Sequence, residues 1–303
     1  MKVLITGATG LVGTALRKHY EEKGIEVHYL TTSNKKIGQG YGSGFLWNPR
    51  KKEMDLQAFE GVTHLVNLAG ASIAQRWTSK NRKSILNSRI DSLSTLNEAL
   101  KQLNSNKIEH FLTASAIGIY PNSYSTEYRE EHAGVDNSFL GEVVEAWEKA
   151  VQPFDAHAFP VSILRIGIVL DAEEGALPKL VQPIVSGVGA PLGSGRQWQS
   201  WIHIQDLVGI IIHAQKHTLS GVYNGVAPQP VRQKELTRAV AKSLGKKIWL
   251  PPVPSFVLRL MLGEMAYIAL ASQRVSAEKI LQTGYAFTFD KVQPALDSLL
   301  PKN

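Results

Sequence analysis

The first part of the chain alternates between short apolar runs and a segment with helical periodicity. Residues 1–5 form an apolar run rich in β-branched side chains, which is typical of a buried strand. The apolar positions that follow fall on one face of a helix, at Leu11, Ala15, Leu16 and Tyr20. Gly24 ends this pattern before a second apolar run at 26–31. The pattern predicts a strand, a tight turn, a helix and a second strand.

The same alternation continues to residue 170. A short strand is predicted at 45–47, where Asn48 and Pro49 end the apolar run, and a buried strand is predicted at 62–70. Helices are expected at 79–103 and 139–151, and further strands at 108–114 and 160–166. Because strands and helices alternate, we predict an α/β fold with a Rossmann-type, doubly wound parallel sheet and right-handed connections.

Three glycines stand in the predicted turn between the first strand and the first helix. Gly7, Gly10 and Gly13 give the spacing G-x-x-G-x-x-G. Glycine permits a tight turn, lets backbone N–H groups approach a pyrophosphate, and lets the helix pack closely on the strand. The anion would lie at the helix N-terminus, where unpaired N–H groups and the helix dipole favour it. The turn predicts a dinucleotide site, and the alternative is an ordinary turn without a ligand.

Beyond residue 170, glycine and proline become frequent and the predicted helices and strands become shorter. We therefore divide the chain into a dinucleotide-binding Rossmann domain at 1–170, to which later segments can return, and a smaller C-terminal substrate-binding region at 171–303. Within the second region, Asp206 is expected to be the N-cap of a helix that ends near residue 216.

The composition of the chain excludes some kinds of site and bears on the choice of partner. The chain has 303 residues, a formal net charge of +7 and no cysteine, which excludes disulfides, thiolate metal sites and cysteine nucleophiles. The basic residues are scattered, so a phosphorylated cofactor accounts for the charge as well as nucleic acid would, and we expect no nucleic-acid partner. Because an apolar strand begins at Met1, we expect no signal peptide and a cytoplasmic protein.

The segment at 251–274 is apolar enough to raise the question of a membrane span. Arg259, Glu264 and Gln273 interrupt it, so that no uncharged run approaches the ~18 residues that a bilayer requires. We therefore expect a packed helix here and no membrane partner.

The loop after the second strand bears on the choice of cofactor. An enzyme that prefers NAD usually places Asp or Glu here to bind the ribose 2′-hydroxyl, whereas the 2′-phosphate of NADP needs hydrogen-bond donors and positive charge. Residues 31–36 contain no acid; the candidate ligands are Thr31, Thr32, Ser33 and Lys35, with Lys36 beside them. The loop favours NADP(H) over NAD(H), and the alternative is a solvated loop.

Several motifs together resemble a known family. The glycine turn, Asn67 to Gly70, Ser115 with Ala116, and the strand that carries Arg165 are similar to the extended short-chain dehydrogenase/reductases, the NAD(P)-dependent epimerase/dehydratase family. Further motifs look like a poorly characterised, epimerase-like branch of that family: Trp77-Thr78, Ser88-Arg89, Trp147-Glu148, Gly193 to Gln197 and Leu262 to Met265. The resemblance extends over essentially the whole chain.

The resemblance implies a Rossmann domain that binds the cofactor and a C-terminal region that closes over the substrate. It assigns the pyrophosphate to Gly7, Thr9, Gly10, Leu11, Val12 and Gly13. It assigns residues 31–36 to the adenosine ribose, and Leu68, Ala69 and Gly70 to the middle of the cofactor. In this branch an arginine often stands where this chain has Thr32, so the prediction of NADP(H) lacks its strongest usual donor.

The chain departs from the family at the usual catalytic pair. The family normally carries Tyr-x-x-x-Lys on the helix after the serine strand; the tyrosine moves a proton during hydride transfer, and the lysine lowers its pKa. Alignment through Trp147 places these positions at about Leu140 and Val144, whose side chains cannot exchange a proton. Lys149 lies further along the helix and is expected to face solvent.

Ser115 and Tyr120 are therefore the candidate catalytic residues. The resemblance implies that Ser115 hydrogen-bonds the reacting oxygen, and Tyr120 follows it closely in the sequence. The alternatives are that Ser115 satisfies backbone groups and that Tyr120 anchors a turn. Glu148 and His203 are further candidates, although a helix glutamate is usually solvated and a lone histidine in a strand is usually structural.

Two arginines are candidates for substrate binding. Arg165 and Arg196 stay protonated and can make bidentate contacts, which points to a substrate carboxylate or phosphate, and structural ion pairing is the alternative. The leading hypothesis is an NADP-dependent oxidoreductase or epimerase-like enzyme acting on a small, polar, anionic molecule. The alternative is a non-catalytic NADP(H)-binding redox sensor or regulatory protein. The oligomeric state is left open.

Overall fold

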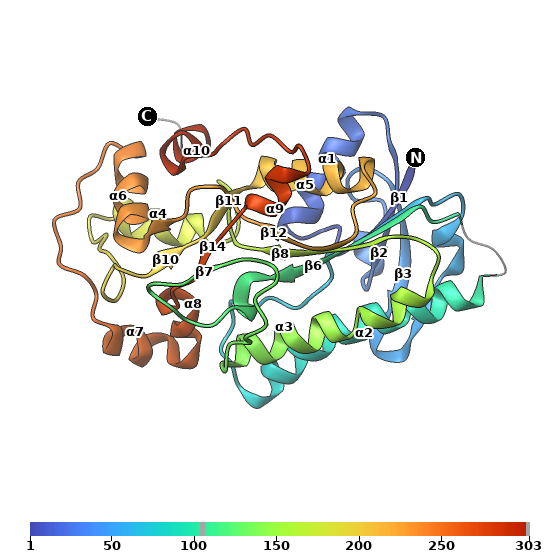
Figure 1. Ribbon diagram of the computed structural model, residues 1–303, viewed down its shortest axis with the longest axis horizontal. Coiled ribbons are helices and arrows are strands. Elements are labelled where there is room, and N and C mark those ends of the chain that lie inside the picture. The colour runs from blue at the N-terminus through green and yellow to red at the C-terminus, as the bar shows by residue number, and fades with distance from the viewer. Residues whose placement is uncertain (104–106, 301–303) are drawn as a thin grey trace.

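The centre of the molecule is an eight-stranded sheet (Figure 1). This computed structural model describes residues 1–103 and 107–300. The strands lie in the order β12, β8, β6, β5, β1, β2, β3, β4, and the neighbours are parallel except for β3 and β4. Their bounds are β1 Lys2–Thr6, β2 Glu26–Thr31, β3 Ser43–Asn48, β4 Glu53–Met54, β5 His64–Asn67, β6 His110–Ala116, β8 Val161–Ile166 and β12 Gly221–Gly225. This order confirms the predicted doubly wound α/β fold.

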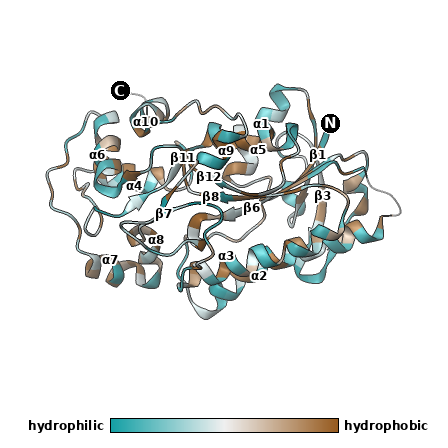
Figure 2. Ribbon diagram, in the orientation of Figure 1, coloured by the Kyte–Doolittle hydropathy of each residue, from teal (hydrophilic) through white to brown (hydrophobic). Residues whose placement is uncertain are grey.

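Helices cover both faces of this sheet (Figure 1). α1 (Leu11–Glu22) and α5 (Ile204–Lys216) pack together on one face, and α2 (Ser79–Gln102) and α3 (Phe139–Lys149) pack together on the other. In Figure 2, polar and apolar positions are interspersed along α2, as in a helix with one solvated and one packed side. The long helix expected at 79–103 is therefore confirmed as a covering layer.

The apolar run of β1 is buried on both faces, as parallel strands between two helix layers are. Val3 and Ile5 pack in the same cluster as Leu16 of α1, whereas Leu4 packs in the cluster that contains Leu96 of α2. The alternation follows from the pleat, because successive side chains of a strand point to opposite faces. This strand therefore holds both helix layers on the sheet.

The remaining elements form a smaller group at the end of the sheet that carries β12 (Figure 1). Its helices include α4 Leu177–Val185, α6 Gln233–Ser243 and α10 Val292–Leu299, whereas α9 Glu278–Gln282 packs on β12 of the main sheet. Three two-stranded sheets join this group to the main sheet: β9 Ile168–Leu170 with β11 Trp201–His203, β10 Trp198–Gln199 with β13 Val231–Arg232, and β7 Glu127–Tyr128 with β14 Arg274–Val275. Fully buried Trp201 lies in the core of this group with Leu177 and Leu236.

The apolar segment at 251–274 forms three short helices instead of the single packed helix expected. They are α7 Ser255–Leu262, the 3-10 helix η6 Gly263–Ala266 and α8 Tyr267–Leu270. Helix α7 ends before Gly263, because the φ of this residue, +60°, lies outside the helical region. Across the two described ranges, no helix is long and apolar enough to cross a membrane.

Two features of the C-terminal half differ in detail from the sequence expectation. α5 and β12 both belong to the main sheet and its helix layer, so segments after residue 170 do return to it; the division at residue 170 stays a prediction. Asp206 is not the N-cap of α5, and that prediction is wrong. His203 is the N-cap residue, and its Nδ1 accepts the N–H of Gln205 at 3.0 Å. Asp206 is buried and accepts the N–H groups of Thr288 and Phe289.

Candidate active site

The turn between β1 and α1 admits only glycine at two of its positions. Gly7 has a φ of +68°, and a Cβ there would lie 2.6 Å from the backbone carbonyl of Leu68. A Cβ on Gly13 would lie 2.3 Å from the carbonyl oxygen of Gly7. Both distances are too short for unbonded heavy atoms. β5 and α1 can therefore approach the turn only because these two residues have no side chain.

The N-terminus of α1 offers unpaired backbone N–H groups to an anion. The N-cap residue is Gly10, so no side chain caps the first N–H groups of the helix. The first turn of α1, which the structure describes, also contains no acidic residue that would repel an anion. The N–H groups of Leu11 and Val12 lie in this turn, where a helix has no partner for them. These donors and the positive end of the helix dipole fit the pyrophosphate of a dinucleotide.

A cleft of about 540 Å³ opens beside this turn, and we call it the glycine-turn cleft. The predicted cofactor residues that line it are Gly7, Thr9, Thr31, Thr32, Ser33, Ala69 and Gly70. Gly10, Leu11, Val12 and Gly13 start α1 next to it, and Leu68 packs its backbone against Gly7. The cleft thus lies at the carboxyl ends of β1, β2 and β5, where open α/β sheets bind ligands.

The basic residues of the glycine-turn cleft differ from the one predicted. Lys36 lines the cleft in place of Lys35, and its Nζ donates a hydrogen bond to Thr9 Oγ1 at 3.0 Å. Arg50 also lines it, which sequence reasoning missed. A signal was present, because Arg50 follows a predicted strand end and parallel strands bring their carboxyl ends to one edge. Asp91 is an acid in this lining, and burial raises its pKa against the opposing charge of Arg50.

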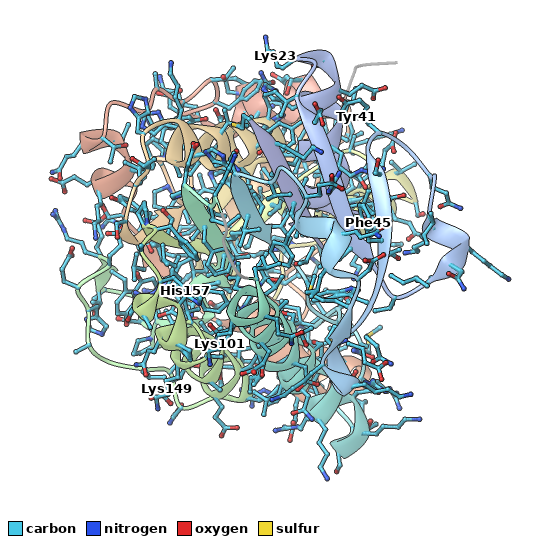
Figure 3. All side chains as sticks on the ribbon, turned by 90° about the vertical axis from the view of Figure 1, so that its right-hand side faces the viewer. Lys23, Tyr41, Phe45, Lys101, Lys149 and His157 are labelled. Carbon is cyan, nitrogen blue, oxygen red and sulfur yellow. The ribbon has the colours of Figure 1, made fainter. Side chains whose placement is uncertain are left out.

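A second cavity, of about 290 Å³, lies at the carboxyl end of β6, and we call it the Ser115 cavity. Ser115 lines it together with Leu140, Val144 and Trp147 of α3. The two positions at which the resemblance leads us to expect a tyrosine and a lysine therefore do face the same cavity as the serine. Lys149 lies outside this cavity at the periphery of α3 (Figure 3) and pairs with Glu145.

The hydroxyl of Ser115 is bound to a buried ion pair. Ser115 Oγ donates to Glu148 Oε1 at 2.6 Å. Arg165 holds both oxygens of the same carboxylate, with Nε at 2.8 Å from Oε1 and Nη2 at 2.8 Å from Oε2. Burial alone would lower the pKa of Arg165, but the hydrogen bonds and charge of Glu148 raise it above its ordinary value. The network fixes the serine hydroxyl at the cavity wall.

Tyr120 does not reach this cavity, contrary to the proposed catalytic role. Its side chain is fully buried, and its hydroxyl donates to Asn224 Oδ1 at 2.8 Å and accepts from Arg165 Nη1 at 2.9 Å. Burial raises the pKa of Tyr120 to about 12, against the opposing effect of Arg165. The structure therefore brings Tyr120 to the back of the Ser115–Glu148–Arg165 network, where it positions Arg165.

The two arginines predicted to bind substrate do not line either cavity. Arg165 forms the structural ion pair named as the alternative, and its Nη1 also donates to the carbonyl oxygen of Glu130 at 3.1 Å. Arg196 is exposed, and its backbone carbonyl accepts a hydrogen bond from Arg232 at 2.6 Å. His203, a further candidate, caps α5 instead.

A third cavity, of about 830 Å³, adjoins the Ser115 cavity, and we call it the outer cavity. Tyr267 lines both. The outer cavity is lined by Trp77, which precedes α2, by Arg82 of α2, by Glu142 of α3 and by Arg259 of α7. Sequence reasoning missed these side chains as site residues, although Trp77-Thr78 and Leu262 to Met265 had been noted as motifs.

Gly70 connects the glycine-turn cleft to the Ser115 cavity. It lines the cleft, and a Cβ at this position would lie 3.1 Å from Cζ of Arg89, which lines the Ser115 cavity. The cleft and the Ser115 cavity therefore adjoin at Gly70 and Arg89, and the Ser115 cavity and the outer cavity share Tyr267.

Comparison with known proteins decides the family. A model of the NAD dependent epimerase/dehydratase family matches residues 3–225, and a model described as a domain of unknown function (DUF1731) matches residues 253–299. This chain belongs to the NAD-dependent epimerase/dehydratase family. Among the similar members, the epimerase family protein SERP0438 of Staphylococcus epidermidis is 34% identical over 302 residues, which cover 99% of each chain. The epimerase family protein YfhF of Bacillus subtilis is 33% identical over 301 residues, covering 99% of this chain and 98% of that protein.

A solved structure of this family has the same fold over the whole chain. The human epimerase family protein SDR39U1, determined with NADPH, has a TM-score of 0.86 and 29% identity, and the match covers 99% of each chain. The resemblance to the epimerase/dehydratase family is thereby confirmed, together with its Rossmann-like fold. The comparisons thus show that this chain has an NAD(P)-binding fold.

Proposed function

We propose that this member of the epimerase/dehydratase family is an NADP(H)-dependent oxidoreductase or epimerase that acts on a small polar molecule. The observation that carries the proposal is the Ser115 hydroxyl, held by Glu148 and Arg165 at the wall of a cavity next to the glycine-turn cleft. A purely structural serine has no need of a buried carboxylate locked by an arginine. The arrangement supports proton transfer at this point.

The preference for NADP(H) rests on the charges of the glycine-turn cleft. Lys36 and Arg50 line it beside Thr31, Thr32 and Ser33, and the described loop at 31–36 has no acid to bind a free ribose 2′-hydroxyl. Two cations and three hydroxyls fit the 2′-phosphate of NADP. The human relative solved with NADPH supports the same preference.

Ser115 and Glu148 together replace the proton-transfer pair that the family normally carries. Bound NADP⁺ would supply the hydride acceptor. As a substrate alcohol is oxidised to a carbonyl, Ser115 Oγ takes the proton of its hydroxyl, and the proton of Ser115 passes to Glu148 Oε1 at 2.6 Å. Leu140 and Val144 keep water from the reacting atoms. Reduction uses the same path in reverse.

We propose that the two regions of the chain divide the binding of cofactor and substrate between them. The first 170 residues provide the glycine turn, Ser115 and Glu148, whereas Tyr267 and Arg259 from the C-terminal region line the cavities next to Ser115. We assign the substrate to the Ser115 cavity and the outer cavity, and the cofactor to the cleft. In this assignment the C-terminal region contributes to substrate binding.

The test is a screen of alcohols and carbonyl compounds for consumption or production of NADPH, followed by variants on the first active compound. Ser115→Ala and Glu148→Gln should each lower kcat by about 10²-fold or more, because each interrupts the proton path. Tyr120→Phe removes a hydroxyl that bonds Asn224 and Arg165 and does not line the cavity, so it should have a much smaller effect. If Ser115→Ala retains full turnover, Ser115 has no catalytic role and the proposal fails. A protein that binds NADPH tightly but turns over nothing would favour the redox sensor.

A further inference from the structure

Arg89 is a half-buried arginine without a carboxylate partner among the described residues. It lies on α2, and its Nη1 donates to the carbonyl oxygens of Ile85 at 2.8 Å and Ala71 at 3.2 Å. Its Nε is buried and has no hydrogen-bond partner. Within residues 1–103 and 107–300, no carboxylate lies at ion-pair distance from its guanidinium, whereas Arg165 pairs with Glu148 and Arg82 with Glu264.

The position of this guanidinium is fixed from two sides. Its Cζ lies 4.8 Å from the centroid of the Trp147 ring, a cation–π contact. On the other side, Gly70 leaves the space that a side chain would fill, since a Cβ there would lie 3.1 Å from Arg89 Cζ. The guanidinium group of Arg89 is therefore held in place without a charged partner, as in a preformed anion-binding site.

Arg89 is also the one charged residue among the described residues that line the Ser115 cavity. The other lining groups are apolar or neutral, including Ser115, Gln199 and Gln273. Burial lowers the pKa of Arg89 to about 10, which reflects the cost of a charge in surroundings that do not compensate it. An anion in the cavity would offset this cost by giving the guanidinium an opposite charge.

We propose that Arg89 binds a carboxylate of the substrate, so that the substrate is a small carboxylic acid with a hydroxyl or carbonyl group that Ser115 contacts. This inference rests on the proposed function. It keeps the anionic substrate expected from the sequence but assigns it to a different arginine. The other anion within reach is a phosphate of the cofactor. Arg89 lines the Ser115 cavity and not the glycine-turn cleft, which favours the substrate.

The test measures binding of acids and their amides to the NADP⁺ complex by calorimetry. A panel of hydroxy and oxo monocarboxylates is titrated, each beside its uncharged primary amide. At least one acid should bind about tenfold or more tightly than its amide, because hydrogen bonds to a charged group carry that difference. Arg89→Met should abolish the difference, and Arg89→Lys should keep part of it. Lys101→Met removes an exposed cation of the same helix that lines none of the three cavities, so it is the control and should leave the difference unchanged.

Three outcomes overturn the inference. In the first, no acid of the panel binds the wild-type complex more tightly than its amide. In the second, Arg89→Met keeps the preference for the acid. In the third, both Arg89 variants lose affinity for NADPH itself by about tenfold or more, which assigns Arg89 to a cofactor phosphate. Failure of wild-type protein to bind any dinucleotide would instead overturn the proposed function, so the two failures are distinguishable.

Discussion

Replacing Glu148 by glutamine should destabilise the protein through the charge that it leaves behind. The side chains of Glu148 and Arg165 are 16% and 9% exposed, and the Nη2–Oε2 distance is 2.8 Å. In Glu148→Gln the guanidinium of Arg165 stays buried, loses its counter-charge and faces an amide N–H₂ group. Removing one partner of a buried ion pair costs about 3–5 kcal/mol, so with this residual exposure we expect about 3 kcal/mol.

The matched control lies one turn earlier on the same helix. Glu145 pairs with Lys149 at 2.9 Å, but these side chains are 43% and 63% exposed. Glu145→Gln makes the same chemical change in water, where such a pair contributes about 0.5 kcal/mol or less. The comparison therefore separates burial from the loss of a carboxylate.

The assay is urea unfolding of both variants and the wild type at neutral pH, followed by circular dichroism. Glu148→Gln should unfold at a clearly lower urea concentration, and Glu145→Gln at nearly the wild-type concentration. The double variant Glu148→Leu with Arg165→Met should recover much of the loss, because no buried charge remains. Equal stability of Glu148→Gln and Glu145→Gln would contradict the expected cost of leaving the Arg165 charge buried and unpaired.

Three further predictions concern the turn, the cleft and the sheet. Gly13→Ala should abolish NADPH binding in calorimetry, because its Cβ would lie 2.3 Å from Gly7 O; wild-type affinity would contradict the close packing. Lys36→Ala should weaken NADPH binding by about tenfold and NADH binding much less, whereas Lys35→Ala should change neither. Burial lowers the pKa of His110 to about 4, so the neutral form stabilises the fold above its unfolded pKa of 6.5, and stability is lost as the pH falls from there towards 4. His110→Asn should reduce this loss of folding stability by up to roughly 3 kcal/mol in unfolding experiments. If the stability of the variant depends on pH as that of the wild type does, His110 is not the group responsible.

The sequence was sufficient where neighbouring residues determine the structure. The strand, glycine turn and helix from Lys2 to Glu22 follow from apolar spacing and from glycine at Gly7 and Gly13, and these signals are local. Ser115 was placed correctly at a strand end in a cavity, because the carboxyl edge of a parallel sheet follows from chain direction alone.

The sequence was insufficient where contacts join distant parts of the chain. Tyr120 was taken for a proton donor because it follows Ser115 closely, but Asn224 and Arg165 from later strands enclose its hydroxyl. Asp206 stands near a helix start, but its partners are Thr288 and Phe289, which no local pattern connects to it. Both errors arise because the hydrogen-bond partners of a buried side chain come from segments that are distant in the sequence.

The central claim is that the glycine-turn cleft binds NADP(H), and calorimetric titration with NADPH, NADH and their oxidised forms tests it most directly. We expect NADPH to bind about tenfold or more tightly than NADH, because Lys36 and Arg50 line the cleft and the 31–36 loop carries no acid. Equal affinity for the two would contradict the assignment of the 2′-phosphate. Binding of no dinucleotide at all would contradict the account as a whole.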